Sequence, residues 1–115
     1  MSPMRLILFT LATALLATSA SAATSNRAER GLALARQHCA ACHAVTANGT
    51  SPHPEAPGWE DIANRPGTTD RTLRRFLSDS HNYPEIMQFT IKRRHIRELS
   101  AWMMALQREN YQPTR

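Results

Sequence analysis

The chain has 115 residues and a formal net charge of +5, with seven Pro, four Gly and only two Cys. This length allows one small domain, and the ordinary share of charged and hydrophobic residues argues against wholesale disorder. Two cysteines exclude both a disulfide-rich scaffold and a four-thiolate zinc site. What remains is a compact domain whose small core is expected to need additional stabilisation.

The first 22 residues have the pattern of a secretory signal peptide. Arg5 precedes an apolar run over residues 6–17, and Ala20 and Ala22 occupy the small-residue positions of a cleavage site. Because the apolar run is shorter than the roughly 20 residues that span a bilayer, a retained membrane anchor is the less favoured interpretation. We therefore predict that residues 1–22 are removed and that residues 23–115 form a domain in the periplasm, without stable membrane insertion. An exported protein is not expected to bind nucleic acid, despite the basic charge.

Helical periodicity predicts three helices in the mature chain. They are expected over about residues 28–39, over 69–79 after a cap at Thr68 or Thr69, and over 93–108. Pro-rich loops connect these segments, and no stretch alternates for long enough to suggest a sheet. The predicted fold class is all-α.

The apolar side chains of the later two helices indicate which faces are buried. In the second helix, Leu73, Phe76 and Leu77 are expected to face inward. In the third helix the apolar residues fall within one arc of roughly 120°, and they are Ile96, Leu99, Trp102, Met103 and Leu106.

Residues 39–43 read Cys-Ala-Ala-Cys-His, the attachment pattern of c-type haem. Two thiols three residues apart at a helix end can each reach a vinyl group on one porphyrin edge, and the adjacent imidazole can then reach the iron. A thioredoxin-like dithiol would need a βαβ context, and a zinc site would need further Cys or His at ligand spacing. The motif therefore predicts one covalent haem c with its iron, attached through Cys39 and Cys42 and ligated by His43.

The chain resembles the small class I cytochromes c over nearly all of residues 27–108. That family begins with Gly-x-x-x-aromatic-x-x-x-Cys-x-x-Cys-His, and here Gly31 and Ala35 precede the motif, with alanine in place of the aromatic residue. The resemblance implies a cytochrome c fold wrapped around one haem. It also implies that Gly31 lies where the first and last helices cross, near Leu99 and Trp102.

Residues 56–63 are similar to the family's Ala-Pro-x-Phe-x-x-Ile-Ala segment. The resemblance implies that the carbonyl of Pro57 accepts a hydrogen bond from the non-ligating nitrogen of His43 and so orients the imidazole. Trp59 and Arg65 lie in the loop that covers the haem propionates in relatives, which makes both candidate propionate donors. The alternatives are a loop-stiffening Pro57, a core Trp59 and a surface Arg65.

The sixth iron ligand is where the chain departs from the family. Relatives usually carry Met-Pro, with the Met three residues before the Phe of a Phe-x-Leu pattern, and Ile86 holds that position here. Met87 is two residues before Phe89 on a loop opened by Pro84, and an irregular loop can absorb a one-residue offset. We predict Met87 as the sixth ligand. His81 is the rival, which would give a bis-histidine haem, and an unligated or water-bound iron is the third possibility.

Together these features predict a soluble periplasmic monohaem cytochrome that carries single electrons. Two protein ligands leave the iron no open site, so we expect neither enzymatic activity nor catalytic residues. The arginine-rich surface would steer the protein toward an acidic patch on a periplasmic redox partner. Two alternatives stay open: a haem subunit dedicated to a periplasmic dehydrogenase or oxidase complex, and an open-site haem enzyme.

Overall fold

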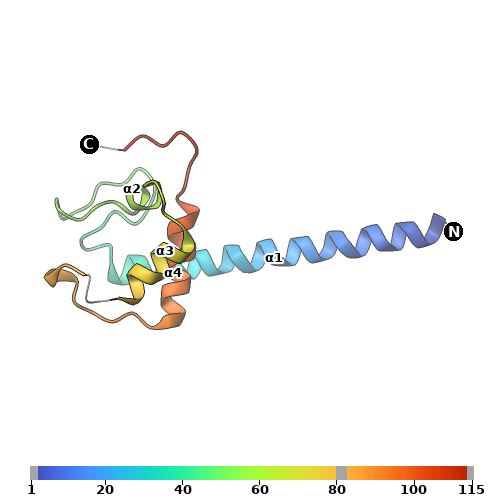
Figure 1. Ribbon diagram of the computed structural model, residues 1–115, viewed down its shortest axis with the longest axis horizontal. Helices are drawn as coiled ribbons and strands as arrows, with labels where there is room; N and C mark the ends of the chain where they lie inside the picture. Colours follow the sequence, from blue (N-terminus) through green and yellow to red (C-terminus); the bar gives the residue numbers. More distant parts are fainter. Residues whose placement is uncertain (1–2, 80–82, 114–115) are drawn as a thin grey trace.

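The computed structural model describes residues 3–79 and 83–113, with the backbone alone described for residues 3–19. Within these ranges the chain forms α-helices and one 3-10 turn but no strand, which confirms the all-α class. The elements in chain order are α1 (Pro3–His38), α2 (Trp59–Ala63), α3 (Asp70–Ser78), η2 (Glu85–Met87) and α4 (Arg93–Ala105). The other helices gather around the C-terminal end of α1, whose N-terminal part extends away from them (Figure 1).

The predicted helices agree with the structure except at their ends. α3 and the start of α4 lie where they were expected, whereas α4 ends at Ala105 rather than near residue 108. α1 ends immediately before Cys39 but begins at Pro3, so it runs without a break through the predicted cleavage site. α2 was not predicted, because a helix of five residues is too short to show a period. Nowhere in the described part of the chain is a helix both long enough and apolar enough to cross a bilayer.

The first and last helices cross at Gly31, as the resemblance implied. A Cβ atom added there would lie 2.0 Å from the carbonyl oxygen of Glu98 and 3.0 Å from the Cβ of Trp102, so the two backbones approach this closely only because Gly31 has no side chain. Beside the crossing, the Nε of Arg30 pairs with the buried carboxylate of Glu98 at 3.0 Å. The crossing makes α1 and α4 the frame on which the rest of the domain packs.

Ala35 stands one turn after Gly31, where the family usually has an aromatic residue. Ala35 is fully buried in the core cluster. Trp102 packs against the same cluster, and its indole N–H donates a 2.7 Å hydrogen bond to the carbonyl of Val45. That bond ties α4 to the loop that follows the cysteine motif.

The prediction that Phe76 faces inward is wrong. Leu73 is buried and Leu77 is half-buried, but the Phe76 side chain is 45% exposed. At about 100° per residue, Phe76 lies about 100° around the helix from Leu77, and the narrow contact of α3 with α4 covers only one of these directions. The Phe76 ring instead lies beside that of Tyr83, with centroids 5.2 Å apart.

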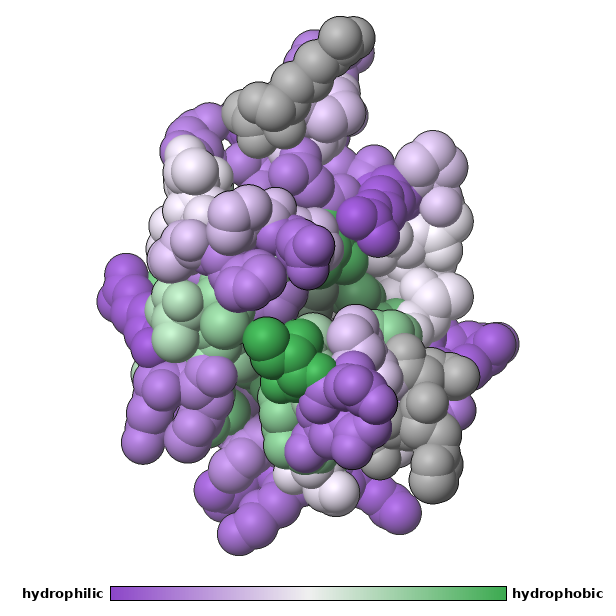
Figure 2. Space-filling view, turned by 90° about the vertical axis from the view of Figure 1, so that its left-hand side faces the viewer, coloured by the Kyte–Doolittle hydropathy of each residue, from purple (hydrophilic) through white to green (hydrophobic). Residues whose placement is uncertain are grey.

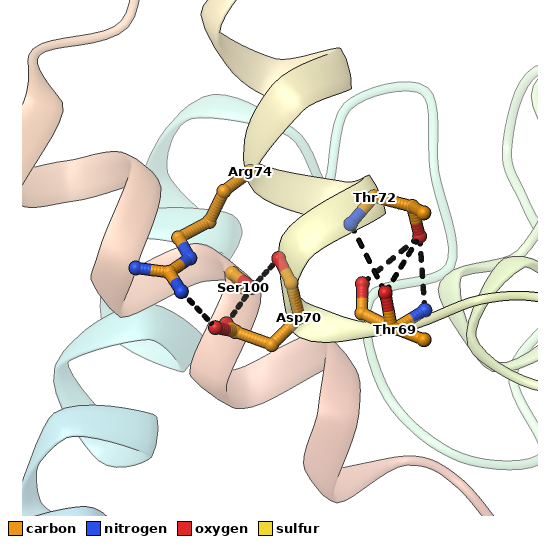
Figure 3. A network of polar contacts seen from close by, with 5 residues as sticks. All are labelled: Thr69, Asp70, Thr72, Arg74 and Ser100. Carbon is orange, nitrogen blue, oxygen red and sulfur yellow. Dashed lines mark hydrogen bonds and ion pairs between the residues drawn. The ribbon is translucent and has the colours of Figure 1, made fainter.

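A small polar network fixes the start of α3 against α4 (Figure 3). Thr69 is the N-cap: its hydroxyl accepts the N–H of Thr72 at 3.1 Å, and the Thr72 hydroxyl accepts the N–H of Thr69 at 2.9 Å. The next residue, Asp70, accepts a 2.5 Å hydrogen bond from the fully buried Ser100 of α4 and pairs with Arg74 at 2.5 Å. This network sets where α3 begins and which of its faces meets α4.

Replacing Thr69 with alanine should lower the free energy of unfolding by about 1 kcal/mol, because α3 loses its reciprocal cap. Thr46→Ala, at an exposed threonine outside the helices, is the matched control and should change that free energy by less than about 0.5 kcal/mol. Denaturant titration of both variants measures the difference. Equal losses would show that the cap contributes nothing.

Candidate functional site

The cysteine motif forms a tight turn at the end of α1. The N–H of Cys39 still bonds to the carbonyl of Ala35 at 2.8 Å, and the carbonyl of Cys39 accepts the N–H groups of Cys42 and His43 at 3.2 and 2.9 Å. Both thiols are free and partly buried. Burial raises the pKa of the Cys39 thiol to about 11, whereas a redox-active dithiol depends on a lowered thiol pKa. The turn therefore suits covalent use of the thiols better than thiol–disulfide exchange.

The imidazole of His43 is held by the backbone of Pro57. The two groups lie 2.8 Å apart, and because a carbonyl can only accept, the ring donates from Nδ1–H. This is the hydrogen bond that the resemblance implies. It leaves the lone pair on Nε2 available to a metal. The ring of Trp59 lies beside that of His43, with centroids 6.5 Å apart.

The loop between the motif and α2 folds back onto the motif. The N–H of His53 donates to the carbonyl of Cys42 at 3.2 Å, and the N–H of Trp59 donates to the carbonyl of Ala44 at 2.9 Å. The Ser51 hydroxyl accepts the N–H of Ala44 at 2.9 Å. These bonds close the loop at both ends, and so fix the Pro57 carbonyl where His43 can reach it.

Glu60 stabilises this loop through its buried side chain, although no sequence pattern predicted this role. Its carboxylate is buried, accepts the N–H of Asn48 at 2.7 Å and pairs with the guanidinium of Arg108 beyond the end of α4. A buried charge is stable only when it is paired and hydrogen-bonded. Glu60 thereby connects the loop, α2 and the C-terminal segment.

Asn64 supplies a second connection between α2 and the C-terminal segment. Its side-chain amide donates to the carbonyls of Glu60 at 2.8 Å and Leu106 at 3.0 Å, and its carbonyl oxygen accepts the N–H of Arg108 at 2.8 Å. No sequence signal marks this residue, because Leu106 and Arg108 lie 42 and 44 residues away in the chain. The end of α2 is thus held against the end of α4.

Met87, the predicted sixth ligand, ends the η2 turn. It is half-buried, and its N–H donates to the carbonyl of Pro84 at 2.7 Å. On one side of the turn the hydroxyl of Tyr83 donates to the carbonyl of Leu77 in α3 at 2.5 Å. On the other side the ring of Phe89 packs edge-on against that of Tyr83, with centroids 5.9 Å apart. Tyr83 therefore anchors the turn to the fold.

The surroundings of the Tyr83 hydroxyl raise its pKa. The pKa of its hydroxyl is raised by burial first, and then by the nearby charges of Asp79 and Cys39. The segment that carries η2 and the C-terminal end of α1, after which the motif follows, lie on the same side of the domain (Figure 1). His81, the rival ligand, lies outside the described residues.

The two candidate propionate donors occupy opposite ends of α2. Trp59 begins the helix and is buried, whereas Arg65 follows the helix and is exposed. Within the described residues, neither the Trp59 indole N–H nor the Arg65 guanidinium donates a hydrogen bond to another protein group. Both donors are therefore available to an anionic group.

The side of the molecule that carries the motif is apolar at its centre. Figure 2 looks onto this side and shows hydrophobic side chains gathered in the middle, with hydrophilic ones around them. Among the side chains that the structure describes, the large hydrophobic ones that stay exposed all lie in or near the η2 turn, and they are Phe76, Ile86 and Phe89. Two thiols, an oriented imidazole and exposed apolar surface are the groups that a covalently bound haem requires. The residues present fit that group.

A family model described as cytochrome c matches residues 28–107 of the chain. The chain belongs to the cytochrome c family. It is 30% identical over 90 residues to a protein named cytochrome c-552 from Bradyrhizobium diazoefficiens, a match that covers 78% of this chain and 85% of the relative. No solved structure gives a significant match.

Membership of the cytochrome c family settles the cofactor and the general activity. Its cofactor is a covalently attached haem c with iron, and the two cysteines of the motif, Cys39 and Cys42, are present to receive it. The family and the cytochrome c-552 relative together indicate an electron-carrying haem protein. Its partners are accordingly other redox proteins.

Proposed function

We propose that this cytochrome c carries single electrons with its iron held between His43 and Met87. The observation that carries the proposal is the placement of two ligand-bearing segments on one side of the domain. The His43 ring keeps Nε2 available because Pro57 occupies Nδ1. The Met87 turn is anchored to α3 through Tyr83, and it lies on the same side of the domain as the C-terminal end of α1 (Figure 1).

The residues around the haem would each do a different task. Cys39 and Cys42 hold the group by thioethers, and the bond from Pro57 increases the basicity of the His43 imidazole. When bound, the haem supplies an iron that alternates between Fe(III) and Fe(II). A thioether from Met87 disfavours Fe(III) relative to a second imidazole, so this ligand set implies the higher of the two reduction potentials.

We also assign the propionate edge to α2. Among the described residues, the side chains of Trp59 and Arg65 donate no hydrogen bond to a protein acceptor. Trp59 also lies beside the proposed ligand His43. Charge-assisted hydrogen bonds from a guanidinium to a carboxylate are stronger than neutral ones. These two residues would therefore hold and orient the haem propionates.

The place of action follows from the N-terminal segment. A basic residue, a short apolar run and two small residues support cleavage after Ala22 and export of residues 23–115 to the periplasm. There the carrier would exchange electrons with other exported redox proteins rather than catalyse a reaction itself, and it would recognise them through acidic surface on the partner.

Met87→Leu tests the ligand assignment, because leucine keeps the volume of methionine but cannot ligate iron. The oxidised wild-type protein should show the weak near-infrared band of iron–sulfur ligation, and Met87→Leu should lose it. The reduction potential should fall by an amount on the order of 0.1 V, within the range of about 0.8 V that axial ligands span. Met104→Leu, a half-buried methionine of α4, is the control and should retain both properties.

Three results would contradict the assignment. The wild-type protein could lack the near-infrared band. The Met87→Leu variant could keep the band. The spectrum could stay unchanged in Met87→Leu and change in His81→Ala.

A further inference from the structure

Away from the motif, α3 and α4 enclose a groove with an unusual charge. Its volume is about 330 Å³, and besides one serine and one isoleucine its lining consists of Arg71, Arg74, Arg75, Arg93 and Arg97. We call this feature the arginine groove. On α3 the lining residues recur at the three- and four-residue spacing of one helix face, so the charges are gathered by the fold rather than scattered.

Most of these charges have no acidic partner within the protein. Arg74 pairs with Asp70 at 2.5 Å. The other four arginines form no ion pair among the described residues, and Asp79, at the end of α3, is already engaged in an interaction of its own. Like charges one helical turn apart, as in Arg71 with Arg75 and Arg93 with Arg97, repel each other. The groove is therefore an arrangement that an added anion would stabilise.

The N-terminal end of α4 would also be stabilised by a negative charge in the groove. Lys92 occupies the N-cap position, and its side chain makes no capping hydrogen bond. The first turn continues with Arg93 and Arg94 and contains no acidic residue. The N-terminal end of a helix dipole favours anions and disfavours cations. Arg93 thus presents its charge and an uncapped helix end to the same groove.

We propose that the arginine groove docks an acidic segment of a partner protein. Guanidinium groups pair with carboxylates through two parallel hydrogen bonds, which gives such a contact both strength and orientation. The inference rests on the proposed function, since an electron carrier must meet other proteins briefly and specifically. The groove is suitably placed, because α4 follows directly on the segment that carries Met87, and Tyr83 bonds that segment to α3.

The form of the groove favours an acidic protein segment over other anions. From Arg71 to Ser78 the lining extends for about 10 Å along α3, at about 1.5 Å per residue, so it suits several carboxylates in a row rather than a single phosphate. A lipid surface is flat and meets protruding side chains, whereas this surface is a groove lined by five arginines. The carboxylates of an extended acidic peptide match both its length and its shape.

The test measures the binding of a fluorescent oligoglutamate peptide to the haem-loaded protein at low ionic strength. Arg75→Gln combined with Arg97→Gln removes two charges from the groove. Arg27→Gln combined with Arg36→Gln removes two exposed charges from α1 and is the matched control. We expect the groove pair to weaken binding at least about tenfold, because it removes charge-assisted contacts, and the control pair to weaken it less than about threefold, because it changes only net charge.

Any outcome other than this expected difference between the two variant pairs overturns the proposal. Equal weakening by both pairs would mean that net charge alone attracts the peptide, and no binding to the wild-type protein would mean that the groove does not dock such a segment. Displacement of the peptide by equimolar inorganic phosphate would assign the groove to a small anion. Groove-dependent binding to phosphatidylglycerol vesicles without peptide binding would assign it to a membrane. The near-infrared band reports ligation in the same samples, so a failed ligand assignment remains distinguishable from a failed docking site.

Discussion

Replacing Cys39 and Cys42 together with serine should abolish stable folding as well as haem attachment. Among the described residues, the largest side chain that is fully buried is that of Ser100, and Phe76, Ile86 and Phe89 remain 44–74% exposed. The core cluster of buried apolar residues is small, and burying one large apolar side chain contributes about 1.5–3 kcal/mol. We therefore expect the haem to supply much of the core, and its loss to remove the cooperative thermal transition.

The measurement is circular dichroism with thermal melting, and the control is the wild-type chain produced without haem. Both haem-free proteins should behave alike, because the missing haem and not the serine substitution causes the effect. A difference between them would assign the loss to the substitution itself. A haem-free variant that melts cooperatively would show that the protein core suffices without the cofactor.

Gly31→Val should be the most destabilising substitution within α1. A valine Cβ would lie 2.0 Å from the carbonyl oxygen of Glu98 and 2.6 Å from its carbonyl carbon, and both atoms belong to backbone that no rotamer change can move. Overpacking costs about 1–3 kcal/mol where side chains can adjust, so we expect a loss of about 3 kcal/mol or more in the free energy of unfolding of the haem-loaded protein. Denaturant titration would measure it.

Ala33→Val is the matched control for this experiment. Ala33 lies two residues further along α1 and is exposed, so valine there introduces only a lower helix propensity, worth up to about 0.7 kcal/mol. A Gly31→Val protein as stable as Ala33→Val would place the crossing of α1 and α4 elsewhere.

What the sequence could predict depended on local patterns. Residues 39–43 identify the haem attachment because the ligands are contiguous, and the apolar arc of α4 needs only a helical period. The crossing at Gly31 came from the family resemblance, and the structure confirms it through the close approach of Glu98. A cap at Thr68 or Thr69 was predictable from the local sequence, and the structure has it at Thr69, three positions before Thr72.

The parts that sequence reasoning missed depend on contacts between distant segments. Glu60 reads as a surface charge until Asn48 and Arg108 are found beside it. Phe76 fits an inward-facing pattern, but the orientation of α3 is set by the bond from Ser100 to Asp70, which no local pattern contains. The arginine groove likewise forms only when α3 and α4 are brought together.

The pairing of Arg30 with Glu98 has a consequence for how the chain folds. The two residues are 68 positions apart, and closing a flexible loop of that length costs about 4 kcal/mol in chain entropy. On the proposed export route, a chain that emerges N-terminus first cannot form this contact until its last helix has emerged, so we expect the crossing of α1 and α4 to form late. This delay keeps the two thiols accessible during the interval in which the haem must be joined to them.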